Sequence, residues 1–233
     1  MFFWQKKNRL VPVTPKNGSK QLTMKQIVKK YSVLICMFIG ASLLVIATLL
    51  YPGGSLADKN AIGFDWSKNF ISNLFAPNAL NGMKNPSRAW AIIGMAFHVV
   101  GNGLFFIHMS QKMPSKHAAV VLKYVGAANM LFTFLIVTVL HDIMVTISST
   151  LSLLGLFYVT VFILKTSLHF WKFCCVVCLL IFYYTLYLYG SGNWGLLAIM
   201  QKVSFICFML LVLGLEYFTS PEDFKQAVPK AIQ

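Results

Sequence analysis

Six long apolar stretches constrain this chain more than any other feature of its sequence. A helix needs about 20 apolar residues to cross the hydrocarbon layer of a membrane. Continuous apolar runs favour helices over the alternating strands of a barrel, because each helix satisfies its own backbone without water. Only 11% of the residues are charged, against about 25% in soluble domains. We therefore predict an all-α fold, a polytopic transmembrane bundle of six helices, with spans at residues 33–51, 89–109, 118–140, 143–164, 173–189 and 195–215.

The spans divide the chain into a basic arm at residues 1–32, a membrane domain at 33–215 and a tail at 216–233. The longest connection is the loop at 52–88, between the first and second spans. His141 and Asp142 alone separate the third span from the fourth, which predicts a tight antiparallel hairpin with its turn at one membrane face.

The positive charges are unevenly distributed between the two sides of the predicted bundle. Fourteen lysine and arginine residues lie on the side of the termini, and four lie on the other side. The positive-inside rule then places both termini in the cytoplasm of a multi-pass protein of the cell membrane. Because topology accounts for the net charge of +14, we expect no nucleic-acid partner. The arm either sets this topology or also binds anionic lipid.

The loop at 52–88 is too apolar to be a simple connection. Trp66, Phe70 and Leu74 follow each other at i, i+4 and i+8, which predicts an amphipathic helix on the outer membrane surface, with Asp65 on a polar flank. Asp65 is one candidate ligand-binding residue.

The second span carries a stripe of small and polar residues. Gly94, His98, Gly101 and Asn102 are spaced to face a neighbouring helix. His98 lies deep in the span, so we expect it in the bundle interior as a hydrogen-bonded packing residue. The alternative is a metal ligand or an acid–base group. Asn102 beside it is a candidate ligand-binding residue.

A histidine and a carboxylate are adjacent where the third and fourth spans meet. Asp142 is expected to cap the fourth span and to oppose its positive end, and Thr146 and Ser149 share its helix face. We predict no cofactor. The alternative is that His98, His141 and Asp142 bind a divalent metal or transfer a proton.

Lys202 lies seven residues inside the sixth span, where a charge is costly. Its long side chain can reach toward water, or it can form a salt bridge to Asp142 or Asp65, or contact a lipid phosphate. Since ionisable groups in a membrane tend to share partners, we predict that His98, Asp142 and Lys202 form one buried cluster open to the outside.

Two short motifs carry a resemblance to a known family. Ile71-Ser72-Asn73-Leu74 is followed by Asn85-Pro86-Ser87-Arg88 before the second span, and His141-Asp142 follows the third. Over about residues 33–215 this layout resembles the bacterial membrane proteins of domain-of-unknown-function family 998, which look like distant relatives of the Frag/DRAM/Sfk membrane proteins. Members have a glycine where Phe75 stands here. The resemblance implies an outer-leaflet lipid connection, with Ser72 and Arg88 as further candidate ligand-binding residues.

We expect an integral membrane protein that binds or handles lipid or another amphiphile at its outward face without covalent chemistry. The alternative is a membrane-embedded lipid hydrolase or transferase that uses His98, His141 and Asp142. A small transporter is the third possibility. Membrane lipid is the expected partner in the first two readings.

Overall fold

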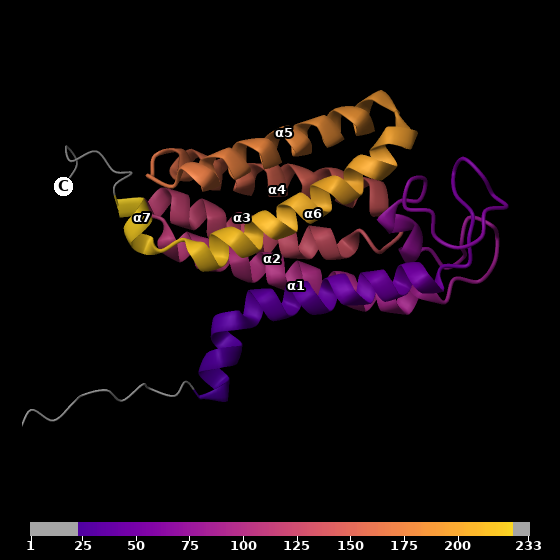
Figure 1. The fold of residues 1–233 in the computed structure, drawn as a ribbon, viewed down its shortest axis with the longest axis horizontal. Coiled ribbons are helices and arrows are strands. Elements are labelled where there is room, and N and C mark those ends of the chain that lie inside the picture. Colours follow the sequence, from indigo (N-terminus) through magenta and orange to yellow (C-terminus); the bar gives the residue numbers. More distant parts are fainter. Residues whose placement is uncertain (1–22, 226–233) are drawn as a thin grey trace, which may run out of the picture. The chain divides into compact units, whose positions relative to one another are not determined.

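The computed structural model describes residues 23–225, and within them the chain forms helices joined by mostly short connections (Figure 1). Six of these helices are long and apolar enough to cross a membrane, which confirms the all-α class and the predicted number of spans. In the described part the only β-type pairings are isolated bridges between Gly53 and Ile62 and between Asn78 and Lys84. The elements are α1 (Met24–Leu50), the 3-10 helix η1 (Ile71–Phe75), α2 (Ser87–Lys112), α3 (Lys116–Leu135), α4 (His141–Leu164), α5 (His169–Ser191), α6 (Trp194–Phe218) and α7 (Pro221–Lys225).

The chain divides into two units, residues 1–30 and 31–233. The division falls within α1 at Tyr31, whose backbone is not helical (φ −105°, ψ 15°). The predicted basic arm lies largely in the first unit, and residues 1–22 of it are outside the described residues. The description below concerns the bundle formed from Tyr31 onward.

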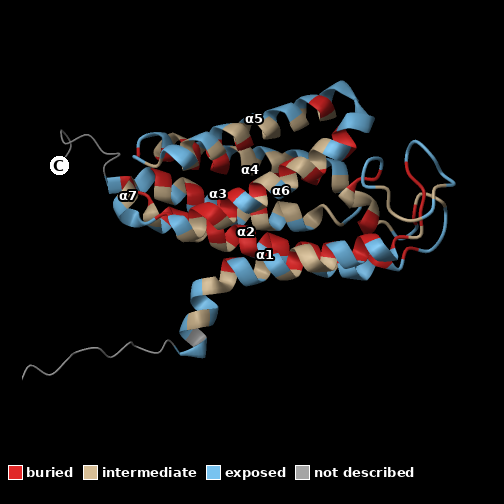
Figure 2. Cartoon of the chain, in the orientation of Figure 1, coloured by how far each residue is buried: buried red, intermediate tan, exposed pale blue. Residues whose placement is uncertain are grey.

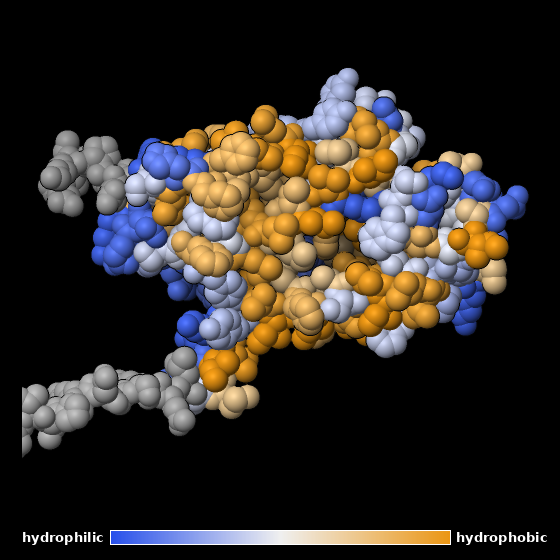
Figure 3. Space-filling model, viewed as in Figure 1, coloured by the Kyte–Doolittle hydropathy of each residue, from blue (hydrophilic) through white to orange (hydrophobic). Residues whose placement is uncertain are grey.

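Successive helices of the bundle run in opposite directions, so that the part of α1 just after Tyr31 lies where α6 ends. There the Tyr217 hydroxyl accepts a hydrogen bond from the Leu34 amide at 3.0 Å, and the Lys112 ammonium donates to the Glu216 carbonyl at 2.7 Å. We call this the terminal end and the opposite one, which carries residues 51–86 and η1, the loop end (Figure 1). Hydrophilic residues gather at both ends and hydrophobic residues between them (Figure 3).

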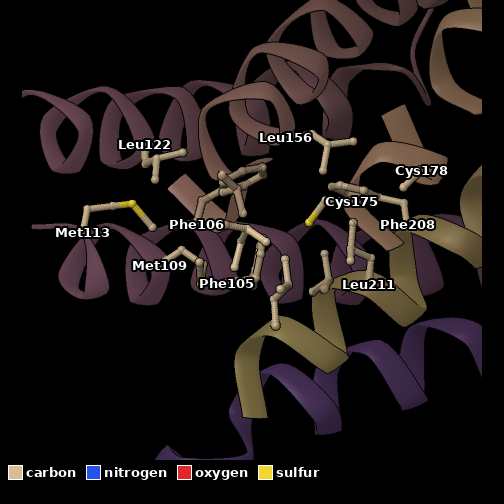
Figure 4. Close-up of a cluster of buried hydrophobic side chains, with 14 of the residues drawn as sticks. Phe105, Phe106, Met109, Met113, Leu122, Leu156, Cys175, Cys178, Phe208 and Leu211 are labelled. Atoms are coloured by element: carbon tan, nitrogen blue, oxygen red, sulfur yellow. The ribbon is translucent and has the colours of Figure 1, made fainter. Parts of the chain in front are cut away.

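The largest core cluster fills the bundle toward the terminal end (Figure 4). Phe106 of α2 is 1% exposed and lies against α3 and α4, where Gly126 and Gly155 leave room for its ring. Buried residues follow the inward faces of the helices in Figure 2, whereas many large apolar side chains point outward. An apolar exterior of this kind is expected of helices surrounded by lipid.

Helices α1 and α2 approach each other closely along the stripe predicted on the second span. A Cβ atom at Gly40 would lie 2.9 Å from the Gly94 carbonyl oxygen. A Cβ atom at Gly101 would lie 3.2 Å from Cys36. The prediction that the small residues of this stripe face a neighbouring helix is confirmed, and the neighbour is α1.

The predicted hairpin between the third and fourth spans was wrong in its boundary. Helix α3 ends at Leu135, and residues 136–140 make the connection. In it the Thr138 amide bonds back to the Leu135 carbonyl at 3.0 Å. His141 and Asp142 therefore belong to the first turn of α4, whose N-cap is Leu140, so Asp142 does not cap this helix but does lie near its positive end. The apolar composition of residues 136–140 concealed the turn, because hydropathy alone does not distinguish the end of a helix from its interior.

The amphipathic helix predicted around Trp66–Leu74 is also wrong. The segment forms a turn followed by η1, in which asparagine side chains bind backbone amides. The Asn69 side chain accepts from the Asp65 amide at 2.9 Å, and the Asn73 side chain accepts from the Phe70 amide at 2.7 Å. The side chains of Phe70 and Leu74 are nevertheless buried.

The loop between α1 and α2 is folded tightly around Asn85. The Asn85 side-chain amide donates to the carbonyls of Leu74 at 3.1 Å and Ala76 at 2.9 Å. The Arg88 guanidinium donates to the Phe75 carbonyl at 3.0 Å. The two motifs at residues 71–74 and 85–88 are therefore bonded to each other, and together they fix η1 over the loop end of the bundle.

Candidate functional site

Two adjoining cavities open the bundle at the loop end. The inner cavity measures about 200 Å³ and lies among α2, α3, α4, α6 and η1. The outer cavity measures about 470 Å³ and lies among α4, α5, α6 and the loop. Their common walls include Ser72 of η1, His141 and Ser149 of α4, and Gln201 and Ser204 of α6.

The polar face of α4 explains why these cavities are not filled. His141, Val145, Ser149 and Ser152 follow each other at spacings of three or four residues, so they project from one side of the helix into the inner cavity. Serine side chains are short and leave space where the leucines and phenylalanines of the core would fill it. Among them, Ser152 accepts a hydrogen bond from Asn129 of α3 at 2.9 Å.

His98 and Asn102 form a buried pair on α2 in the wall of the inner cavity. They are 5% and 7% exposed. The Asn102 amide nitrogen lies 2.8 Å from His98 Nε2, and the imidazole stacks on Phe205 of α6 with ring centroids 4.3 Å apart. The expected position of His98 in the bundle interior is confirmed.

Polar atoms without a partner are concentrated in this cavity. In the described part of the chain four buried side-chain atoms lack a hydrogen-bond partner, and three of them belong to walls of the inner cavity: His98 Nδ1, Asn102 Oδ1 and His141 Nε2. Such atoms are rare in proteins, because each unmade bond costs about 1–3 kcal/mol. Because the three atoms belong to residues that line one cavity, this cavity is the candidate site for another molecule.

The His141 ring is oriented by its neighbour in sequence. His141 Nδ1 lies 2.9 Å from Asp142 Oδ1, so the proton of a neutral ring sits on Nδ1 and Nε2 is left as an acceptor. The Asp142 side chain is 87% exposed and lines only the outer cavity. His98 and His141 share a cavity wall. Asp142 is exposed beside that wall, so the prediction that Asp142 lies in a buried cluster with His98 is wrong.

Lys202 does not lie with His98 and His141 at the inner cavity, contrary to the predicted cluster of His98, Asp142 and Lys202. Its ammonium donates to the Asn69 carbonyl at 2.6 Å and to the Ala198 carbonyl, and it lies 5.9 Å from the centre of the Phe64 ring. No ion pair of the described residues joins it to Asp142 or Asp65. Adjacent residues of a helix point about 100° apart. This is why Gln201 faces the cavities while Lys202 faces the loop.

The remaining predicted ligand residues fall into two groups. Ser72 and Asn102 line a cavity, whereas Asp65 and Arg88 hold the loop. Hydrogen bonds from the hydroxyl and the amide of Ser67 keep the pKa of the Asp65 carboxyl below its usual value, and Lys68 adds a smaller effect. Asp65 is thus engaged within its own turn.

Sequence reasoning did not assign Gln201 and Ser204 to the site. Gln201 lines both cavities, and its side-chain oxygen accepts from the Ile71 amide at 2.9 Å, which attaches η1 to α6. The available signal was the spacing of Gln201, Ser204 and Phe205 on one side of α6.

The metal alternative stays untested. Within residues 23–225 no group of three or more histidine, cysteine, aspartate or glutamate side chains is arranged to hold a metal ion. His98 and His141 share the inner cavity with the amide of Asn102, a set whose unpartnered atoms suit hydrogen bonding.

Comparison of the chain with protein-family models, with curated proteins and with solved structures gave no match.

Proposed function

We propose that this protein binds a membrane lipid or a similar amphiphile in the two cavities at its loop end. In this proposal it is a multi-pass protein of the cell membrane, its termini are cytoplasmic and the loop end faces outward. The observation that carries the proposal is the outer cavity, whose volume of about 470 Å³ falls in the range of small-molecule sites.

The walls of the outer cavity suit a molecule that is partly apolar. Phe182, Leu186 and Leu197 provide apolar surface, and hydroxyl groups of α4 and α5 provide polar contacts. Thr146 and Thr150 line the cavity and are also exposed, so the cavity reaches the surface of the bundle along α4. For helices embedded in a bilayer, an opening at this place admits a lipid from the side.

Photo-crosslinking in lipid nanodiscs tests the proposal. Diacylglycerol and phosphatidylethanolamine, each with a diazirine in one acyl chain, serve as probes, and mass spectrometry locates the labelled peptides. We expect at least one probe to label cavity-lining residues of α4, α5 or α6. Ser149→Phe, which fills the cavity, should reduce this labelling several-fold. Leu154→Phe, on the exposed side of the same helix, should leave it unchanged.

Labelling spread evenly over the outer surface of the helices, with equal yields in both variants, would contradict the proposal. Thr185→Phe, which fills the same cavity from α5, provides a second filled form if Ser149→Phe does not fold. Thermal unfolding of each variant separates loss of binding from loss of structure.

A lipid hydrolase or transferase is the second candidate, and the His141–Asp142 pair favours it. His141 Nε2 is a buried acceptor without a partner, in a cavity wall that also contains the hydroxyls of Ser72 and Ser149. A histidine oriented by a carboxylate can take the proton of a serine that attacks an acyl carbonyl, and can return it to the leaving group.

An alkyl fluorophosphonate tests the enzymatic candidate, because it labels only activated serines. Labelling that is abolished by His141→Ala and by one of Ser72→Ala or Ser149→Ala would establish a nucleophile. Absence of labelling in a protein that still cross-links to lipid would leave the binding function alone.

A further inference from the structure

The charges around the two cavities distinguish among classes of amphiphile. Among the described residues that line them there is no lysine or arginine, and Asp142 is the one acidic residue. The nearest ammonium along α6 is that of Lys202, and it is engaged with two backbone carbonyls. A phosphate head group placed here would meet a carboxylate and no fixed cation, which is unfavourable in a medium of low dielectric constant.

The unpartnered atoms of the inner cavity require a particular combination of hydrogen bonds. With the Asn102 amide donating to His98 Nε2, the proton of a neutral imidazole is on Nδ1, so Nδ1 is a free donor and Asn102 Oδ1 is a free acceptor. If the amide is turned over, the Asn102 oxygen accepts from Nε2, and Nδ1 becomes the free acceptor beside a free amide donor. In both arrangements the pair offers one donor and one acceptor.

A hydroxyl group matches this combination. It can accept from the donor of the His98–Asn102 pair and donate either to the acceptor of that pair or to His141 Nε2, which is also unpartnered. A phosphate monoester or diester offers acceptors almost exclusively, and an ammonium offers donors only. The inner volume of about 200 Å³ suits a small head group, and the larger apolar cavity beside it suits the adjoining part of a chain.

We infer that the inner cavity binds the free hydroxyl group of an uncharged lipid alcohol, such as a diacylglycerol, while its chains occupy the outer cavity. This inference rests on the proposed binding function and specifies its ligand. It places His98, Asn102 and His141 around the hydroxyl, and it assigns selection against phospholipids to the absence of a cation from the described walls.

Competition against the photoactivatable diacylglycerol tests the inference with three unlabelled lipids: dioleoylglycerol, its methyl ether and dioleoyl phosphatidic acid. We expect dioleoylglycerol to compete best. The methyl ether keeps the oxygen but has no proton to donate, so it should compete about ten-fold less well, as one lost hydrogen bond in a buried site predicts. Phosphatidic acid should compete less well still.

Asn102→Leu tests which residues make the distinction. It removes one side of the donor and acceptor pair, so the preference for dioleoylglycerol over its methyl ether should decrease toward equality. Thr160→Val is the matched control, because it removes a buried hydroxyl of α4 that donates to the Leu156 carbonyl and lines neither cavity. It should keep the full preference. If Asn102→Leu does not fold, the ratio measured for the unchanged protein decides by itself.

Each outcome has a separate meaning. If neither photoactivatable lipid labels the cavity, the proposed binding function fails. If phosphatidic acid competes as well as dioleoylglycerol, binding stands and the inference is overturned. Equal competition by dioleoylglycerol and its methyl ether also overturns it, because the hydroxyl proton then makes no hydrogen bond in the inner cavity.

Discussion

Two ionisable side chains lie deep in the helices near the loop end, and their polar atoms are satisfied to different degrees. Lys202 donates to the carbonyls of Asn69 and Ala198, so its charge is compensated by backbone dipoles. His98 has one partner, Asn102, and keeps a free ring nitrogen. A fully satisfied group stabilises the fold, whereas an incompletely satisfied one is kept at a cost. This contrast favours a structural role for Lys202, and it is consistent with the binding role that the proposed function gives to His98.

Replacing Lys202 should therefore destabilise the protein. Lys202→Met keeps most of the side-chain volume but removes the ammonium that joins α6 to the loop, and it leaves the Asn69 carbonyl without this donor. We expect the free energy of unfolding to fall by about 1.5–3 kcal/mol, the range for a hydrogen bond to a charged group, and the midpoint of thermal unfolding in detergent to fall with it. Lys123→Met, at an exposed position of α3, should change the midpoint little. Equal midpoints for the two variants would refute this role.

The depth of Lys202 was predictable from the sequence, and its partner was not. Hydropathy places residue 202 inside a span, and the cost of burial predicts that it finds a partner. The expected partner was a carboxylate, since charge is the only complement that residue types reveal. Backbone carbonyls are present at every residue, so the selection of Asn69 depends on how the loop folds over α6.

At the scale of elements, the loop of residues 51–86 differs most from its prediction. Periodic apolar residues predicted a helix lying on the membrane. The structure instead has a loop built on asparagine side chains: Asn69 donates to the Gly54 carbonyl at 2.7 Å, and Asn85 holds the C-terminal half of η1 through the carbonyls of Asn73 and Ala76. These bonds join residues up to 15 positions apart, so a helical period read within nine residues could not contain them. The apolar residues remain useful as anchors, since Phe70 packs with Leu188 and Leu197.

Asn85→Ala should open this loop. It removes the donor to the Leu74 and Ala76 carbonyls and the acceptor for the Ser87 amide at 3.1 Å. We expect the free energy of unfolding to fall by about 2–3 kcal/mol, because buried polar groups are left unpaired. We also expect faster tryptic cleavage within the loop. Asn78→Ala, at an exposed position of the same loop, is the control and should be cleaved at the rate of the unchanged protein. Equal rates for both variants would show that other contacts hold the loop.

At the scale of the whole molecule, the six helices were predictable, and the cavities between them were not. Each helix is specified by its own apolar run, which hydropathy detects directly. The inner cavity instead combines His98 of α2, Asn129 of α3, His141 of α4 and Gln201 of α6, and their proximity depends on how the helices pack. Phe208 belongs both to the wall of this cavity and to the core cluster of Figure 4. That cluster fills the bundle between the cavity and the terminal end. This closed arrangement favours binding over passage through the protein.

The sequence predicts which side of the membrane the cavities face, because fourteen basic residues lie on the predicted side of the termini and four on the other. The positive-inside rule predicts that the loop end is outside the cell. Cysteines introduced at Asn60 and at Asn78, both exposed in the loop, should react with a membrane-impermeant thiol reagent added to intact cells. A cysteine at Ser167, exposed in the connection between α4 and α5, should react only after the cells are opened. Native Cys36, Cys174 and Cys207 are only partly buried and would be replaced by alanine.

The structure permits this background because Cys175 and Cys178 are 0% and 3% exposed and can remain in the core. The parent without introduced cysteines should stay unlabelled, which checks that the reagent does not reach them. Because the six spans fix the two ends of the bundle on opposite sides, the loop cysteines and the Ser167 cysteine must give opposite results. Labelling of Ser167→Cys in intact cells, with both loop cysteines protected, would show that the topology is the reverse of the predicted one. The cavities would then open toward the cytoplasmic leaflet, and their ligand would have to be sought among the lipids of that leaflet.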